Sequence, residues 1–239
     1  MNWERVKNFL IVLFIGINIF LVCFMLTSFK DSASVNKSVV KDTVSILNAN
    51  NISINEDIVP SSISNPGTFD VVAINVDSSY QSPKTLDAGN TESELKKALK
   101  VLGVKDYEII KKDDVTYSVM QKTNGYFIFD SGINAKINGN NIALDGVWYK
   151  QQTKPKSDGY SDGGIVYVTG ILIDFINNAD RNPSVHNEIT GIDVGYCVPQ
   201  YDSGLDHKSM PAVPCYCITT ANGTAFLYDA VSGSYLKNK

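Results

Sequence analysis

The sequence predicts an α+β protein in which one N-terminal transmembrane helix is followed by an extracytoplasmic body of antiparallel sheets and a few packed helices, arranged as two lobes. Three observations lead to this prediction. An uninterrupted apolar run fills residues 9–26. Several short segments rich in β-branched and aromatic residues are separated by polar turns, and other segments repeat apolar residues at helical spacing.

The apolar run (FLIVLFIGINIFLVCFML) contains no charge and a single amide, Asn18. A helix needs about 20 mostly apolar residues to cross a bilayer, so residues 9–29 are long enough. The run exceeds the ~7–15 residues of a secretory h-region, and no small-x-small cleavage site follows it, so we expect a retained anchor rather than a cleaved leader. Arg5 and Lys7 favour a cytoplasmic tail over residues 1–8 and a body outside the cell, although lysines also follow the run.

One face of the expected anchor repeats residues at spacings of three and four, which places them in one stripe along a helix. An amide at this depth can hydrogen-bond to another helix, at about 0.6–2 kcal/mol, and a neighbouring glycine permits close approach. The stripe is therefore a candidate contact surface for a partner's transmembrane helix, and the alternative is an inert anchor that tolerates one amide. The candidate contact residues are Asn8, Ile15, Gly16, Asn18 and Val22.

The charge balance argues against one class of partner. The 239 residues have a formal net charge of −4, and Glu4, Arg5 and Lys7 give the first 29 residues +1, so the rest carries −5. A mildly acidic body lacks the basic face that nucleic-acid binding needs. Roughly 210 residues suffice for one large domain or two small lobes with a real core.

The body is expected to begin with a helix over residues 34–47, because Val40, Val44 and Leu47 share one face and Ser34 can cap it. Residues 69–76 (FDVVAINV) are short and β-branched, which predicts a strand. Residues 78–90 are expected to form a loop.

Residues 91–102 are the clearest helix outside the apolar run. Thr91 and Glu94 have the capping-box spacing at its start, and Leu95 and Leu99 lie on its apolar stripe. Gly103 stands where a left-handed residue commonly ends a helix, so the pattern predicts both ends of this element.

An antiparallel meander is expected next. Four β-prone segments are separated by the turns KDD, TNG and NGN, and Asn-Gly between β-prone segments is a strong hairpin signal. The expected strands cover residues 107–111, 115–121, 126–130 and 142–150.

A polar, glycine-rich stretch at residues 154–164 (KPKSDGYSDGG) is the expected loop or boundary between an N-terminal lobe, residues 30–153, and a C-terminal lobe, residues 165–239. The second lobe is expected to contain a helix, a strand and a closing hairpin around Asn222-Gly223, with a proline-containing loop before the hairpin. These elements are assigned to residues 165–179, 189–198, 201–213 (the loop), 215–220 and 224–229.

The body has three cysteines, and an odd number cannot pair completely within one chain. We expect buried free thiols, because C-x-C on a strand places both sulfurs on one face. One disulfide from Cys197 to Cys215 or Cys217 is an alternative in an oxidising compartment. A zinc set of Cys197, His207, Cys215 and Cys217 is a weaker alternative, so no metal or cofactor is expected.

The sequence offers few groups for catalysis. His186 and His207 are the only histidines, and no G-x-S-x-G, P-loop, H-E-x-x-H or G-x-G-x-x-G motif occurs. We therefore expect a protein that is not an enzyme. Tyr196 and Tyr216 are expected to pack in the core or between the lobes, and the alternative is that they line a ligand groove.

Motifs at both ends of the chain form a recognisable combination. A tryptophan-basic head (WERVKN, residues 3–8) precedes FIGINIFL (14–21), and EITGIDVGY (188–196), PAVPCYCI (211–218) and YDAVSG (228–233) follow in the C-terminal part. Together these motifs resemble the YycI/YycH proteins of Gram-positive bacteria. The middle of the chain matches only by the order of its elements, and Cys215 and Cys217 replace residues that are more often apolar or aromatic.

The resemblance implies a single-pass membrane protein that regulates the sensor histidine kinase of the cell-wall two-component system through transmembrane and extracellular contacts. It implies two partners, the kinase's transmembrane region and a second protein of the YycH/YycI type, and it carries over no catalytic residue. The modest length favours the YycI-like member. A PepSY-like extracellular binding or protease-inhibitory module is the alternative, because such domains share the closing strand-turn-strand, and a zinc-dependent enzyme is a third hypothesis.

Overall fold

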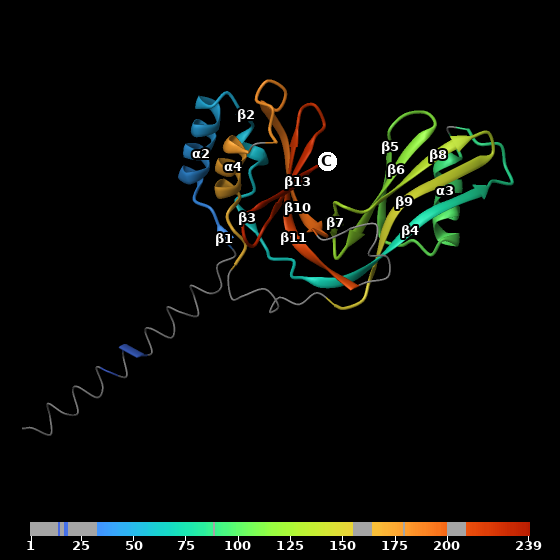
Figure 1. Cartoon of the computed structure of the whole chain (residues 1–239), viewed down its shortest axis with the longest axis horizontal. Coiled ribbons are helices and arrows are strands. Elements are labelled where there is room, and N and C mark those ends of the chain that lie inside the picture. Colours follow the sequence, from blue (N-terminus) through green and yellow to red (C-terminus); the bar gives the residue numbers. More distant parts are fainter. Residues whose placement is uncertain are drawn as a thin grey trace, which may run out of the picture.

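The computed structural model describes residues 33–87, 89–154, 164–178, 180–199 and 209–239, together with Phe14, Ile17 and Asn18. Between residues 33 and 239 the described chain is an α+β protein, as predicted, with three α-helices and a mostly antiparallel sheet. Eleven strands pair into one continuous sheet that is bent into two lobes (Figure 1), and two short strands pair separately.

The first lobe, here called the meander lobe, comprises residues 69–151. Its strands pair in the order β4-β9-β8-β6-β5, all antiparallel. One face of this sheet is covered by α3, where Leu95 and Leu99 are buried against strand residues such as Val119 and Ile133. The elements are β4 (Phe69–Gln81), α3 (Thr91–Val101), β5 (Tyr107–Lys111), β6 (Thr116–Thr123), β7 (Tyr126–Ile128), β8 (Gly132–Asn138) and β9 (Asn141–Gln151).

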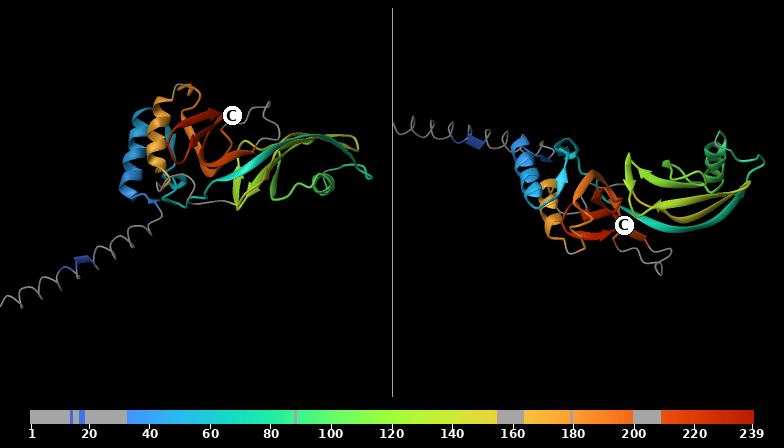
Figure 2. Two further views of the ribbon diagram at one scale, coloured as in Figure 1. Left: turned by 60° about the horizontal axis from the view of Figure 1, so that its bottom comes forward. Right: turned by 90° about the horizontal axis from the view of Figure 1, so that it is seen from above.

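The second lobe, here called the terminal lobe, is built from both ends of the described body. Helices α2 and α4 lie side by side on one face of the sheet β10-β11-β12-β13 (Figure 2). Their buried residues, including Leu47 and Phe175, pack with Tyr216 and Ile218 of β11. The elements are β1 (Ala33–Ser34), α2 (Lys37–Ala49), β2 (Ser53–Ile54), the 3-10 helix η1 (Glu56–Ile58), β3 (Ser62–Ile63), α4 (Val168–Asn177), β10 (Glu188–Cys197), β11 (Ser209–Thr220), β12 (Ala225–Asp229) and β13 (Tyr235–Asn238).

This grouping differs from the expected division into residues 30–153 and 165–239. The apolar face of α2 cannot stay in water, and the C-terminal elements cover it, so that Leu47 and Ile52 are fully buried in their core. β2 also pairs with β10. The expected boundary at residues 154–164 lies mostly outside the described residues.

Two strand pairings join the lobes. β4 pairs antiparallel with β11, from Val72 opposite Ser209 to Phe69 opposite Ala212, and β7 pairs parallel with β10. Because β10 and β11 also pair with each other, the strands β11, β4, β9, β8, β6, β7 and β10 form a closed circuit. The lobes are therefore held together at two places rather than by a single connection.

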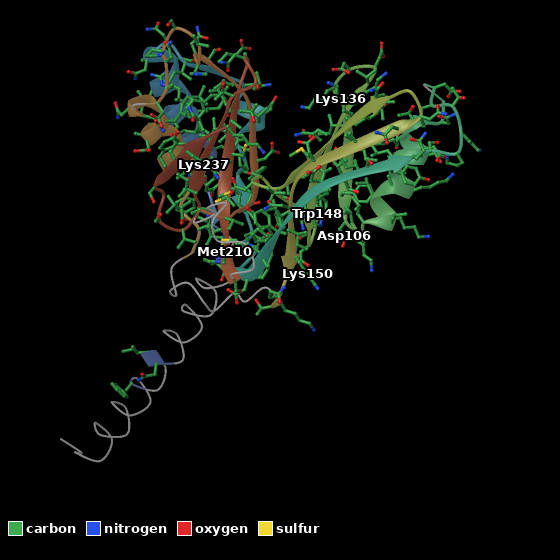
Figure 3. All side chains as sticks on the ribbon, turned by 45° about the vertical axis from the view of Figure 1, so that its right-hand side comes forward. Asp106, Lys136, Trp148, Lys150, Met210 and Lys237 are labelled. Carbon is green, nitrogen blue, oxygen red and sulfur yellow. The ribbon has the colours of Figure 1, made fainter. Side chains whose placement is uncertain are left out.

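A small apolar core fills this junction. Phe69 and Tyr196 meet edge to face with ring centroids 4.7 Å apart, and Tyr149 and Met210 pack in the same cluster. Met210 lies at the narrow end where the lobes meet (Figure 3). The Tyr196 hydroxyl donates to the Pro66 carbonyl at 2.8 Å. The prediction that Tyr196 is a core or lobe-interface residue is confirmed.

The first helix begins later than expected. Asn36, not Ser34, caps α2, because its side chain accepts from the Ser38 N–H at 3.1 Å while Ser34 pairs in β1. Val40 and Leu47 are buried and Val44 is partly buried, as predicted.

The predicted capping box of α3 is wrong. Asn90 stands at the N-cap without a side-chain cap bond, and the Thr91 hydroxyl donates instead to the Asp87 carbonyl at 2.7 Å. Glu94 is buried and pairs with Lys97 at 2.6 Å. The predicted end is confirmed, since Gly103 has φ +72°.

The predicted helix near residues 165–179 is present as α4, with Ile171, Leu172 and Phe175 buried. Three predictions for strands were incomplete. β4 continues to Gln81 through part of the expected loop, and neither β8 nor β13 was expected.

The expected loop before the closing hairpin is shorter than predicted, because β11 begins at Ser209 and contains Pro211 and Pro214. A proline cannot donate to a strand ladder. Both prolines lie near the point at which β11 changes its partner from β4 to β10, where Ala212 pairs with Phe69 and Val213 with Cys197. The change of partner explains how the strand accommodates them.

Candidate functional site

The candidate site is a cleft between the free sheet faces of the two lobes. In each lobe helices cover one face of the sheet and leave the other face turned toward the opposite lobe. The cleft has a volume of about 730 Å³, within the range of 300–1,000 Å³ that is typical of ligand pockets. Its existence was not predicted from the sequence.

The wall from the meander lobe is formed by alternate residues of β5, β6 and β8. Tyr117 and Val119 of β6 point to the α3 side and are buried, whereas Ser118 and Met120 line the cleft and are half-buried. Ile110 of β5 lines the same wall. This wall therefore mixes the apolar side chains of Ile110 and Met120 with polar and charged groups from the same strands and their ends.

The wall from the terminal lobe comes from β10, β11 and β12. Cys217, Thr219 and Leu227 line it, and their neighbours Ile218 and Phe226 face the helices. The Cys217 and Thr219 side chains lie 3.9 Å apart. Like the opposite wall, this one mixes apolar side chains with polar and charged ones, among them Asp193 and Lys239.

The floor of the cleft is formed by β7 and the segment that links it to β8. Phe127 of β7 and Phe129 of the link give it an apolar surface. Asp130 has 5% side-chain exposure, pairs with Lys237 of β13 at 2.5 Å, and accepts the Val198 N–H at 2.7 Å. Lys237 stands on the terminal lobe (Figure 3), so this ion pair ties the link to that lobe.

Two glycines allow the backbones at the floor to approach closely. A Cβ at Gly195 would lie 2.4 Å from the Phe127 carbonyl oxygen and 2.7 Å from the Phe129 ring. A Cβ at Gly146 would lie 2.1 Å from the Gly132 carbonyl oxygen. Only glycine fits where β10 pairs with β7 and where β9 pairs with the start of β8.

Charges at the cleft are partly paired. Glu108 pairs with Lys122 at 2.5 Å, and the Lys122 ammonium lies 4.4 Å from the centroid of the Phe127 ring. Asp193 faces the cleft, and within the described part of the chain its carboxylate has no hydrogen bond or ion pair. Burial raises the pKa of Asp193 above its ordinary value.

The three cysteines of the body are free and buried, as predicted. They share one face of the β10-β11 pair, because Cys215 is opposite Gly195 and Cys217 is opposite Asp193. Burial raises the pKa of Cys217 to about 11, so its thiol is protonated at neutral pH. Among the described residues no group of three His, Cys, Asp or Glu side chains is placed to hold a metal ion, and His207 of the weaker zinc set lies outside them.

His186 has a packing role in the terminal lobe. Its ring is 5.1 Å from the Phe226 ring, and Nδ1 lies 3.2 Å from the Thr220 hydroxyl and 3.1 Å from the Asn222 side-chain oxygen. It therefore fixes the end of β11 and does not face the cleft.

The expected anchor falls almost entirely outside the described residues, including the candidate contacts Asn8, Ile15, Gly16 and Val22. Asn18 is described, and its side-chain N–H₂ donates to the Phe14 carbonyl one turn earlier at 2.8 Å. One N–H of the amide is thus satisfied by a carbonyl one turn earlier, and this bond leaves its other N–H and its oxygen for further partners. Within the ranges that the structure describes, no helix is both long enough and apolar enough to cross a membrane.

Comparison of the chain with models of known protein families gives no match. Comparison with curated protein sequences also gives none. The cleft residues were missed because they come from eight strands, β5 to β12, of both lobes. The one signal for them in the sequence is the polar-apolar alternation of β6, which marks a face that no helix covers.

Proposed function

We propose that this chain is a membrane-anchored, non-enzymatic regulator of a two-component sensor histidine kinase, with its body outside the cell. The observation that carries the proposal is the cleft, whose two sheet faces offer apolar side chains interspersed with polar and charged groups, a combination that can bind another molecule. The apolar run at residues 9–29 and the resemblance of both chain ends to the YycI/YycH proteins support the kinase as target.

In this proposal the chain acts at two levels. The stripe around Asn18 contacts the transmembrane region of the kinase, and the body binds an extracellular part of the kinase or a second regulator of the YycH/YycI type. α2 follows the expected anchor directly, so the terminal lobe is the part of the body nearest to it in the chain.

The test combines crosslinking in the membrane with a measurement of kinase output, read as phosphorylation of the response regulator. The full-length chain is compared with a chain carrying an unrelated transmembrane helix and with the variants Asn18→Leu and Gly16→Leu. Phe20→Leu serves as control for Asn18→Leu, because residue 20 lies about 200° from residue 18 around an expected helix. Recovery of the kinase and a change of output with the native anchor alone supports the proposal.

Two results would count against it. If deletion of the protein leaves kinase output unchanged, the regulatory role is wrong. If Asn18→Leu and Gly16→Leu behave like Phe20→Leu at equal expression, the transmembrane contact is wrong.

The cleft also favours a second candidate, an extracellular binding or protease-inhibitory module of the PepSY-like kind. Its walls are made by the body alone, so binding there does not require the native anchor. This function predicts equal partner capture by the native and the anchor-swapped chains, with no kinase recovered from either.

A further inference from the structure

The edge of the meander sheet carries unpaired backbone groups beside the cleft. Within the described residues β5 pairs only with β6, which leaves its other edge free (Figure 1). Glu108, Ile110 and Lys112 line the cleft with their side chains. The free edge therefore borders the opening between the two lobes.

The ladder fixes which backbone groups of β5 point outward. Lys122 N–H bonds the Asp106 carbonyl at 2.6 Å, and Lys112 N–H bonds the Thr116 carbonyl at 2.9 Å, so the even residues of β5 bond to β6. In an antiparallel pair the bonding side alternates along each strand. The N–H and C=O groups of Tyr107, Ile109 and Lys111 therefore point away from the sheet.

We propose that the cleft binds an extended polypeptide segment of a partner protein, which pairs as an added strand with the free edge of β5. This inference rests on the proposed function, because it specifies how the body recognises its protein partner. Three residues of β5 point their backbone groups outward. Because only every second residue of a strand bonds to a given neighbour, these three can pair with an added strand of about six residues. The added strand turns alternate side chains toward the cleft.

The unpaired charges at the cleft define the chemistry of this segment. Lys112 and Asp193 have no ion-pair partner among the residues that the structure describes, and they belong to opposite walls. The ammonium of Lys239 donates to the Phe129 carbonyl at 2.9 Å and likewise meets no carboxylate there. We expect an acidic residue near Lys112, a basic residue near Asp193, and apolar residues between them against Met120 and Leu227.

Charged residues on the edge strand β5 disfavour its pairing with strands of other copies of the protein. Lys111 pairs with Asp114 at 2.9 Å, Glu108 adds a charge to the same short strand, and Lys112 adds one directly after its end. Charged residues on a short edge strand oppose aggregation between copies of a protein. These charges therefore favour the binding of a segment with complementary charge over a strand without it.

The probe is a phage-displayed library of random twelve-residue peptides, selected on the full-length chain in lipid nanodiscs. Enriched peptides are synthesised and measured by fluorescence anisotropy. Each is also made with N-methyl groups at every second residue, in the two possible phases. Methylation in the phase that faces β5 should abolish binding, whereas methylation in the other phase should leave it unchanged within about threefold.

Variants of the protein test the same contact. Lys111→Pro removes an outward N–H at an exposed position whose N–H does not bond to β6, and it should weaken binding about tenfold. Lys111→Ala loses the same side chain but keeps the N–H, so it should stay within twofold. Ser118→Trp fills the cleft and should abolish binding, and thermal unfolding shows whether each variant is folded.

The proposal is overturned if no peptide is enriched, if Lys111→Pro and Lys111→Ala bind alike, or if a folded Ser118→Trp variant binds like the original protein. Kinase output is measured separately. Loss of peptide binding in Lys111→Pro with unchanged kinase output would show that the pairing does not serve the regulatory role, whereas the regulatory role itself is tested by deletion of the protein. The opposite pattern would refute the pairing but not the regulatory role.

Discussion

Gly195→Ala should break the contact that closes the ring of strands. Gly195 of β10 pairs with Phe127 of β7 in one of the two connections between the lobes. A methyl group there would lie 2.4 Å from the Phe127 carbonyl oxygen and 2.9 Å or less from two carbons of the Phe129 ring. Gly195 is not among the glycines with positive φ, so the effect is steric and not a matter of backbone conformation.

The magnitude follows from the distance. Carbon–oxygen contacts begin near 3.3 Å, so one strand must move by roughly 1 Å to admit the methyl group. Overpacking costs about 1–3 kcal/mol, and the upper end applies because the nearest atom is backbone and cannot rotate away. For a chain of this size about 3 kcal/mol lowers the midpoint of thermal unfolding by roughly 6–12 °C.

The assay is thermal unfolding of the full-length protein in detergent micelles, followed by intrinsic fluorescence. Gly191→Ala is the matched control, because it lies on the same strand and its added methyl group would come no closer than 3.7 Å to Thr219. The control should change the midpoint by less than about 2 °C. Equal midpoints for the two variants would refute the close approach of β10 and β7.

Three further outcomes are expected. A double-mutant cycle on Asp130 and Lys237 should give a coupling of about 1–2 kcal/mol in urea unfolding, because Asp130 is almost fully buried, and a value near zero would show that the pair does not tie the lobes. The hydrogen bond from Lys97 holds the pKa of Glu94 below its ordinary value, so stability from this carboxylate is present at neutral pH and is lost on acidification. Glu94→Gln should therefore be less stable at neutral pH and should lose less stability between pH 7 and pH 3 than the original protein, and parallel pH curves would contradict this. After alkylation in denaturant without reductant, mass spectrometry should show that all four cysteines are modified, whereas only two modified cysteines would reveal a disulfide.

The elements that the sequence predicts well are those fixed by local chemistry. Asn124 and Gly125 both have positive φ in a two-residue turn, which few residues other than Asn and Gly adopt readily. Gly103 ends α3 for the same reason. The strand at Tyr107–Lys111 was predicted with the bounds that the structure shows, because a helix end and a polar turn flank it.

The site could not be predicted in this way, because it depends on contacts between distant segments. The pairing of β4 with β11 joins residues more than 130 positions apart, and no local pattern encodes it. The packing of α2 with the C-terminal elements likewise depends on which apolar face is available to cover it. The capping box failed for a related reason, since Glu94 has a partner in Ser82, which donates to it at 3.2 Å.

The placement of α2 connects the expected anchor to the cleft. Only residues 30–36 separate the anchor from α2, and α2 buries Leu47 in the core that contains Tyr216 and Ile218 of β11. The other face of β11 carries Cys217 and Thr219 into the cleft. A segment bound in the cleft would therefore lie one sheet away from the helix that follows the expected anchor.

The closed circuit of strands gives this arrangement a mechanical consequence. A single connection would let the meander lobe swing freely and absorb any binding event, but two connections make it move with the terminal lobe. Under the proposed function, force on β5 reaches β10 and β11 through the circuit, and then α2 through the shared core. This route requires that an anchor-swapped chain keep its peptide affinity while losing its effect on the kinase, and joint loss of both would show that the anchor shapes the cleft itself.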